Sequence, residues 1–180
     1  MYSTVMTSML CGIRAIPVQV EVDISTGLPA FEMVGYLSSE VREAKERVRT
    51  ALHNCGVSLP AKRITINLSP GNVRKTGTGF DLPIAVALLS AIGVLDEMCS
   101  RQKVFVGELN LSGQLLPVNG ILPVVSDGCR DGVHTDFIIP MDNLAEGELV
   151  RDASVYGFSS LEAVIAYLRG GAYEKPALTM

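Results

Sequence analysis

The 180-residue sequence contains no long hydrophobic run, no close pair of cysteines and only two histidines. Its apolar stretches, such as Leu82 to Leu89, fall far short of the roughly 20 residues that a membrane span needs. The cysteines are too far apart for a zinc or redox motif: Cys11, Cys55, Cys99 and Cys129. The first residues also lack the basic and apolar segments of a signal peptide. We therefore expect a protein of the reducing cytoplasm with no metal site and no membrane partner.

Charged residues are scarce, at 19% of the chain, and the net charge is −4. Their distribution is uneven, because the stretch from Arg42 to Lys75 has eight basic and two acidic residues. The remainder has seven basic and seventeen acidic residues. An acidic body with one basic stretch is typical of a surface that contacts an anionic partner. A solvated helix face followed by loop lysines explains the same charges, and both interpretations stay open.

Recognisable catalytic and nucleotide-binding motifs are missing. The segment from Lys75 to Gly79 contains the residue types of a phosphate-binding loop, but in the wrong order. No serine lies in the G-x-S-x-G pattern of a nucleophile elbow. The residues alone therefore predict neither ATP binding nor a catalytic group.

The first part of the chain has the periodicities of strands followed by a helix. Apolar and polar residues alternate from Val18 to Ile24, which predicts a strand, and Gly27 with Pro29 predicts a hairpin back into residues 31–34. The apolar spacing then changes to three and four residues. This predicts an amphipathic helix that is capped near Ser39 and stopped by Gly56.

The second part mixes helices and strands around a strongly apolar helix. Asp81 is expected to cap this helix, which runs from Leu82 to Ile92 and is apolar on nearly every side. The other predicted elements are a strand at 64–68, two strands and a turn within 104–118, a helix at 121–130, a strand at 137–140, a helix at 143–150, a strand at 154–158 and a helix at 160–168. Strict βαβ alternation is absent, so the fold class is α+β or mixed α/β.

Five segments, in order along nearly the whole chain, carry a family resemblance. They are Gly27–Gly35, Val41–Arg49, Arg63–Pro70, Gly79–Ala85 and Gly107–Gly113. Together they resemble the N-terminal region of the magnesium-chelatase-like AAA+ family typified by the competence protein ComM, also called YifB. The resemblance implies that residues 1–170 form a Lon-protease-like domain, with the fold of the second domain of ribosomal protein S five. It also implies that residues 171–180 lead toward an ATPase module outside this sequence, where ATP and Mg²⁺ would bind, so that the chain is a fragment.

The likeness to Lon bears on catalysis. Lon-type proteases use a serine that is activated by a lysine with a lowered pKa. The position matching the serine is Gly79, and the position matching the lysine, after the Leu116–Gly120 stretch, is Leu122. Glycine offers no nucleophile and leucine no base. The resemblance therefore implies a non-catalytic domain.

The resemblance also implies a DNA partner. ComM-like proteins are DNA branch-migration helicases that act in natural transformation, and the related domain of RadA contributes to DNA contact and ring assembly. The implied DNA contacts lie at Lys62, Arg63, Arg74 and Lys75, through phosphate groups. No aromatic residues are interleaved with these basic residues, so base stacking is not expected.

Three functions remain open from the sequence. The first is an accessory domain of a hexameric AAA+ DNA motor, which helps ring assembly and DNA contact. The second is a peptidase with a displaced dyad, in which Ser69 or Ser126 is paired with Lys75. The third is a subunit of a magnesium chelatase.

Overall fold

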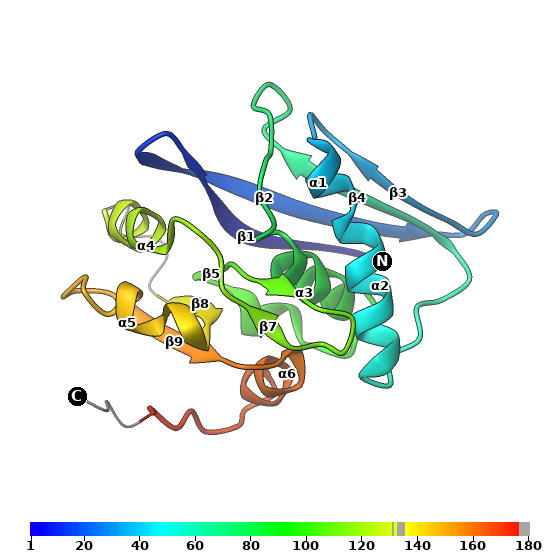
Figure 1. The fold of residues 1–180 in the computed structure, drawn as a ribbon. Coiled ribbons are helices and arrows are strands. Elements are labelled where there is room, and N and C mark those ends of the chain that lie inside the picture. The colour runs from blue at the N-terminus through cyan, green and yellow to red at the C-terminus, as the bar shows by residue number, and fades with distance from the viewer. Residues whose placement is uncertain (131, 133–135, 177–180) are drawn as a thin grey trace.

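The computed structural model describes residues 1–130, 132 and 136–176, and seven strands of this part form one mixed sheet. The strand order is β3-β4-β2-β1-β5-β8-β9 (Figure 1). These strands are β1 (Tyr2–Cys11), β2 (Arg14–Ser25), β3 (Ala30–Val34), β4 (Arg63–Ser69), β5 (Lys103–Phe105), β8 (Asp136–Pro140) and β9 (Ser154–Phe158). The pairs β1–β2 and β2–β4 are antiparallel, and the other four pairs are parallel. The mixed α/β class predicted from the sequence is confirmed.

The helices and a small hairpin pack around this sheet. The helices are α1 (Ser39–Arg42), α2 (Ala44–Asn54), α3 (Asp81–Ala91), α4 (Ile121–Cys129), α5 (Leu144–Gly147) and α6 (Leu161–Leu168), with 3-10 turns at Glu97–Ser100 and Met141–Asn143. The hairpin consists of β6 (Glu108–Leu109) and β7 (Leu115–Leu116), which agrees with the turn predicted within residues 104–118. No helix within the described residues is both long and apolar enough to cross a membrane.

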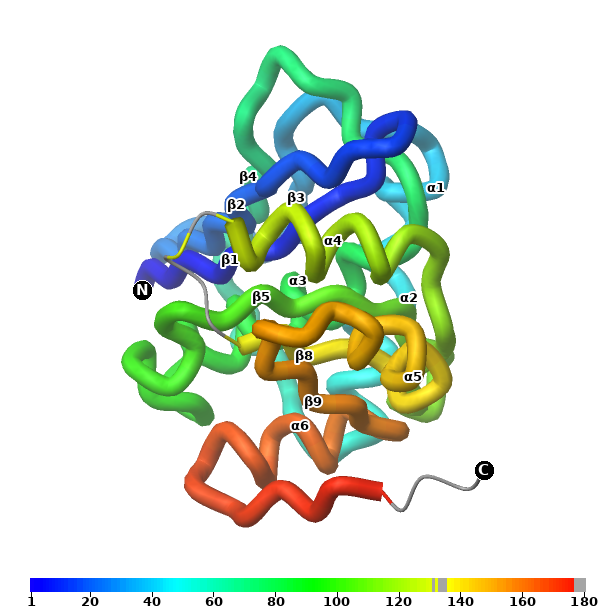
Figure 2. The backbone as a smooth tube through the Cα atoms, turned by 90° about the vertical axis from the view of Figure 1, so that its left-hand side faces the viewer, coloured from blue at the N-terminus to red at the C-terminus, as the bar shows by residue number. Residues whose placement is uncertain are grey.

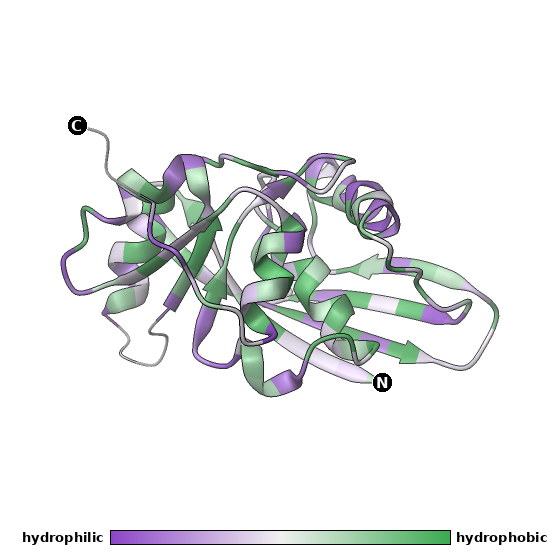
Figure 3. Cartoon of the chain, turned by 90° about the horizontal axis from the view of Figure 1, so that it is seen from below, coloured by the Kyte–Doolittle hydropathy of each residue, from purple (hydrophilic) through white to green (hydrophobic). Residues whose placement is uncertain are grey.

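Two apolar clusters lie on opposite sides of the C-terminal half of the sheet. Side chains alternate along β8, so that Ile138 packs with α3 in the larger cluster, whereas Phe137 and Ile139 pack with α4 in the smaller one. Figure 3 colours the chain by hydropathy, and hydrophobic residues are frequent along its strands. Helix α3 is buried at ten of its eleven residues, which confirms the expected central helix. Figure 2 shows α4 on the side of the molecule that faces the viewer there, in front of α3.

The predicted hairpin at Gly27 and Pro29 is wrong. Strand β3 pairs with β4 in parallel, and β4 lies between β3 and β2. A parallel pair needs a long crossover connection, and α1 with α2 supplies it between β3 and β4. The glycine and proline therefore mark a wide loop after β2.

The predicted helix from Ser39 to Cys55 is divided at Glu43 into α1 and α2. Its start is confirmed, because the Ser38 hydroxyl accepts a hydrogen bond from the Val41 amide at 3.3 Å. Its end is confirmed as well, since Gly56 follows with a φ of 84°.

The role predicted for Asp81 is wrong, because the N-cap of α3 is Phe80 and the Asp81 side chain points into the interior. Helix α5 is also shorter than the predicted helix at 143–150. The other predicted elements occur, at β4, β5 to β7, α4, β8, β9 and α6.

The residues after α6 return along the strand β9. The Tyr173 ring packs against Tyr156, Phe158 and Tyr167, and its hydroxyl oxygen accepts a hydrogen bond from the Gly157 amide at 3.0 Å. Part of the tail expected at 171–180 thus packs on the domain. Residues 177–180 of that tail lie outside the described residues.

Candidate functional site

A cavity of about 420 Å³ lies beside the loop that precedes α3. Its wall comes from the end of β1, the loop before α3 and the segment that enters α4. The lining residues are Ser8, Met9, Leu10, Glu40, Thr76, Gly77, Thr78, Gly79, Phe80, Val106, Val118, Asn119 and Val124. This is the place at which the resemblance to Lon would put a catalytic serine.

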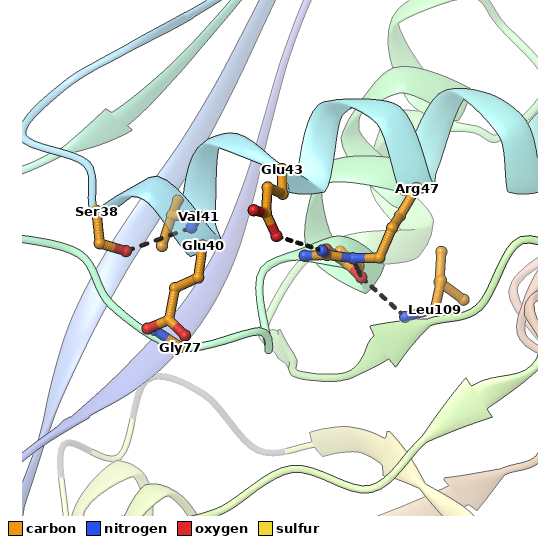
Figure 4. A network of polar contacts seen from close by, with 8 residues as sticks. Ser38, Glu40, Val41, Glu43, Arg47, Gly77 and Leu109 are labelled. Atoms are coloured by element: carbon orange, nitrogen blue, oxygen red, sulfur yellow. Dashed lines mark hydrogen bonds and ion pairs between the residues drawn. The ribbon is translucent and has the colours of Figure 1, made fainter.

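The loop is fixed by contacts with α1 and β1. The Gly77 amide donates a hydrogen bond to Glu40 Oε1 at 2.6 Å (Figure 4), and the Thr76 amide donates to Met9 Sδ at 3.2 Å. The backbone of Lys75 is bonded to both Tyr36 and Ser38. The loop is therefore a fixed part of the fold.

The two positions that the resemblance matches to the Lon dyad are occupied by Gly79 and Leu122. Gly79 lines the cavity, and a Cβ built there would lie 2.9 Å from Val106 Cγ1, so a serine would need Val106 to move. Leu122 is half-exposed on α4 and does not line the cavity, and its amide donates a hydrogen bond to Glu146 Oε1 at 3.1 Å. This cavity thus has neither a serine at 79 nor a lysine at 122.

Lys75 does not project from the loop, which corrects the expectation that its ammonium is presented to a partner. The residue is fully buried, and its Nζ donates a hydrogen bond to the Pro70 carbonyl oxygen. Burial lowers the pKa of this ammonium. Lys75 therefore connects the two ends of the loop that follows β4.

A buried ion pair lies between α2 and the start of α3 (Figure 4). Arg47 donates hydrogen bonds to both carboxylate oxygens of Asp81, at 2.7 and 3.0 Å, and the Leu109 amide donates a third at 3.0 Å. The Asp81 side chain is 0% exposed and that of Arg47 is 19% exposed. Burial raises the pKa of Asp81 to about 6, although Arg47 and the Leu109 amide act in the opposite direction. The hydrogen bond to Asp81 in turn raises the pKa of Arg47.

The four basic residues predicted to contact DNA do not form one cluster. Arg63 begins β4 and Arg74 follows its end, and a strand of seven residues is about 20 Å long. Arg63 Nη2 lies 3.4 Å from Glu32 Oε2 on the sheet surface, and Arg74 is exposed in the loop. Lys62 lines a different cavity, and Lys75 is buried. DNA contact by these residues stays a prediction.

The cavity that Lys62 lines, of about 480 Å³, was not predicted from the sequence. It lies between α2, the start of β3 and the segment before β4, and three of its residues are basic: Arg49, His53 and Lys62. Arg49 lies over the ring of Phe31, 5.0 Å from the centroid. The spacing of Lys45, Arg49 and His53 by four residues was a visible signal for one basic helix face. The ring beside that face is seen only once β3 is placed.

The loop before α3 does not fit ATP phosphates. The Lys75 side chain points inward, the Leu82 amide in the first turn of α3 donates to the Gly107 carbonyl oxygen at 3.0 Å, and the Asp81 carboxylate lies beside it. Amides that are already paired and a buried carboxylate oppose an anion. Within the described part of the chain, no three His, Cys, Asp or Glu side chains are placed to hold a metal ion.

Comparisons with known proteins agree with the fold and with the resemblance in sequence. Residues 20–143 match the family model described as subunit ChlI of Mg-chelatase. The chain is 41% identical over 159 residues to the competence protein ComM of Haemophilus influenzae, covering 88% of this chain and 31% of ComM. It is 40% identical over 178 residues to the YifB protein of Escherichia coli, covering 98% of this chain and 35% of YifB. Lon protease 1 of Bacillus subtilis is 29% identical over 151 residues, covering 80% of this chain and 19% of that protease. The chain thus spans about a third of the length of its ComM and YifB relatives.

Proposed function

The chain belongs to the family of subunit ChlI of Mg-chelatase, and from this premise we propose that it is a non-catalytic, Lon-like accessory domain of a hexameric AAA+ ATPase. It helps to assemble the ring and to contact DNA during branch migration, in DNA uptake and recombination. ATP and Mg²⁺ act in an ATPase module outside this chain.

The observation that carries the proposal is the distribution of charge. The basic stretch of the sequence folds into α1, α2, β4 and the loop after it, which lie together on one side of the molecule (Figure 1). Five of its basic side chains are exposed, Arg42, Arg49, Lys62, Arg63 and Arg74, although Arg63 is paired with Glu32 on the other face of the sheet. The rest of the chain has an excess of acidic residues. Such asymmetry attracts and orients a polyanion.

The absence of a serine at 79 and a lysine at 122 supports a structural role for the cavity beside the loop that precedes α3. Glu40 and Met9 hold that loop, and the Arg47–Asp81 pair holds the start of α3. These contacts stabilise the junction of α1, α2 and α3, which a domain in a ring needs in order to keep its shape.

Fluorescence anisotropy with labelled single-stranded and branched DNA tests the proposal. The variant Lys62→Gln/Arg63→Gln/Arg74→Gln removes three exposed charges of the basic side, and Arg101→Gln/Arg151→Gln/Arg169→Gln removes three exposed charges elsewhere. We expect salt-sensitive binding that the first variant loses and the second retains. Absence of binding at low ionic strength, or equal loss in both variants, would contradict DNA contact by this domain.

One observation favours a peptidase as the second candidate. Lys75 is buried and its pKa is lowered, as a lysine general base requires. Its Nζ donates a hydrogen bond to the carbonyl oxygen of Pro70, the residue that follows Ser69. A fluorophosphonate probe that labels Ser69 or Ser126 in the wild type, and fails to do so in Lys75→Met, would support this function. An unlabelled protein would exclude it.

The family match itself favours the third candidate, a subunit of a magnesium chelatase. Copurification with porphyrin-binding subunits would support that assignment over the DNA motor.

A further inference from the structure

The cavity between α2 and β3 combines positive charge with an aromatic ring. Its lining is Pro29, Ala30, Phe31, Arg49, His53, Val57, Ser58, Leu59, Pro60, Lys62 and Ile64, which contains no Asp or Glu. Its volume of about 480 Å³ lies within the range of about 300–1,000 Å³ that is usual for small-ligand sites. From these features we infer that the cavity binds a base and its adjoining phosphates in a single strand of nucleic acid. This inference rests on the proposed role in DNA contact.

The ring of Phe31 is held in place by α2. The Lys45 Nζ donates a hydrogen bond to the Phe31 carbonyl oxygen at 3.1 Å, and the Arg49 guanidinium carbon lies 5.0 Å from the ring centroid. The ring packs partly against the core and carries the exposed Arg49 guanidinium over it, so an unpaired base stacks on the exposed part of this Arg49–Phe31 pair. Stacking of this kind accepts any base.

The rim of the cavity supplies the phosphate contacts. Arg49, His53 and Lys62 are exposed, and none of them forms an ion pair with a carboxylate in the part of the chain that the structure describes. Their donors therefore remain available to an anion. Because the rim is exposed, the nucleotides on either side can continue along the surface. Arg63 points to the other side of the sheet, where Glu32 is its partner, and takes no part.

The geometry distinguishes a single strand from a duplex. In a duplex the bases are already stacked on one another, so their faces are not available to Phe31 and Arg49. A single strand offers both an unstacked base and phosphates. The cavity is therefore selective for strand form and indifferent to sequence.

Anisotropy of a labelled 20-nucleotide oligo-dT against the 180-residue chain tests the inference, with a duplex of equal length and dTMP as competitors. Phe31→Leu keeps an apolar side chain and removes the ring, and we expect it to weaken oligo-dT binding about 5- to 150-fold. Lys62→Gln should reduce the slope of log K against log salt by about 0.7, as the loss of one phosphate contact requires. Arg101→Gln, an exposed change outside the cavity, should leave binding unaltered.

A crosslinking experiment locates the base. Ultraviolet crosslinking of 5-iodouracil-labelled oligonucleotide, followed by mass spectrometry, should recover the peptide that contains Phe31. If Phe31→Leu fails to fold, Arg49→Gln replaces it, since that side chain is exposed and should cost at least fivefold in affinity.

The outcomes separate this inference from the proposed function. If Arg63→Gln/Arg74→Gln weakens DNA binding while Phe31→Leu and Arg49→Gln leave it unchanged, the proposed role of the cavity is overturned and DNA contact by the domain stands. Equal affinity for duplex or dTMP would also overturn it. Absence of any DNA binding at low salt would overturn both.

Discussion

Removing the guanidinium of Arg47 should lower the free energy of unfolding, because the buried Asp81 carboxylate loses its counter-ion. In Arg47→Met the alkyl part of the side chain is kept, while Asp81, 0% exposed, loses two of its three hydrogen bonds and its counter-ion. Breaking a buried pair in this way costs about 3–5 kcal/mol. A domain of this size is stable by about 5–15 kcal/mol, so the loss is a large part of the total.

The loss should depend on pH in a defined direction. The pKa of Asp81 is already raised from 3.8 to about 6, and removal of Arg47 takes away two causes that lower it. A carboxyl whose pKa is raised by folding contributes most below its unfolded value, and the contribution is lost as pH rises through the folded value. The destabilisation should therefore be greatest at pH 7.5 and smaller at pH 5, with a slope of up to about 1.4 kcal/mol per pH unit.

Urea unfolding followed by circular dichroism measures this effect, because the chain has no tryptophan for fluorescence. Arg42→Met, an exposed change on α1, is the control and should stay within about 0.5 kcal/mol of wild type. Adding Asp81→Asn to Arg47→Met should restore much of the stability at pH 7.5, since the buried group is then neutral. A loss below about 1 kcal/mol, or one that is equal at pH 5 and 7.5, would refute the reasoning.

Three further predictions concern the same region. The unfolding free energy of wild type relative to Asp81→Asn should fall by up to about 3 kcal/mol between pH 4 and pH 7, because folding raises the pKa of Asp81 from 3.8 to about 6. Urea titrations at each pH measure this difference, and a rise with pH would contradict the prediction. Gly79→Ser should lower stability by about 1–3 kcal/mol in thermal unfolding, because its Cβ would lie 2.9 Å from Val106 Cγ1, and Gly79→Ser/Val106→Ala should recover part of it. Ser38→Ala should cost about 0.5–2 kcal/mol by removing the cap of α1, and Ser38→Asp should retain most of the stability.

Periodic segments of the fold were predictable because local patterns determine them. The alternation of β2, the buried helix α3 and the turn between β6 and β7 all follow from spacing and glycine placement. The position of β3 did not follow, because pairing with β4 rather than β2 is decided by the crossover through α1 and α2. Turn residues indicate where a strand ends but do not specify its next neighbour.

The candidate site was less predictable because its contacts are long-range. Arg47 and Asp81 are separated by 34 positions, and neither has a sequence signal for the other. The residues around Lys75 are polar and rich in glycine, as in an exposed loop, yet the Lys75 side chain is fully buried against Pro70. The absence of aromatics interleaved with basic residues argued against stacking, but β3 places Phe31 beside Arg49, which follows it by 18 positions. The spacing of basic residues along α2 shows that they share one helix face, but it does not show which residues of other elements lie beside that face.

The pair β1–β5 is the shortest backbone pairing in the seven-stranded sheet. The two strands share one pair in register, Met6 with Val104, whereas β1 and β2 are paired along ten residues. Besides this single backbone pair, helix α3 packs on both parts of the sheet from one face. Helix α4 does so from the other face, where its Asp127 Oδ2 accepts a hydrogen bond from the Ala15 amide at 2.9 Å. The two parts of the sheet are therefore joined mainly by side chains packed on α3 and α4, so the rigidity of the domain depends on how well both helices fit against them.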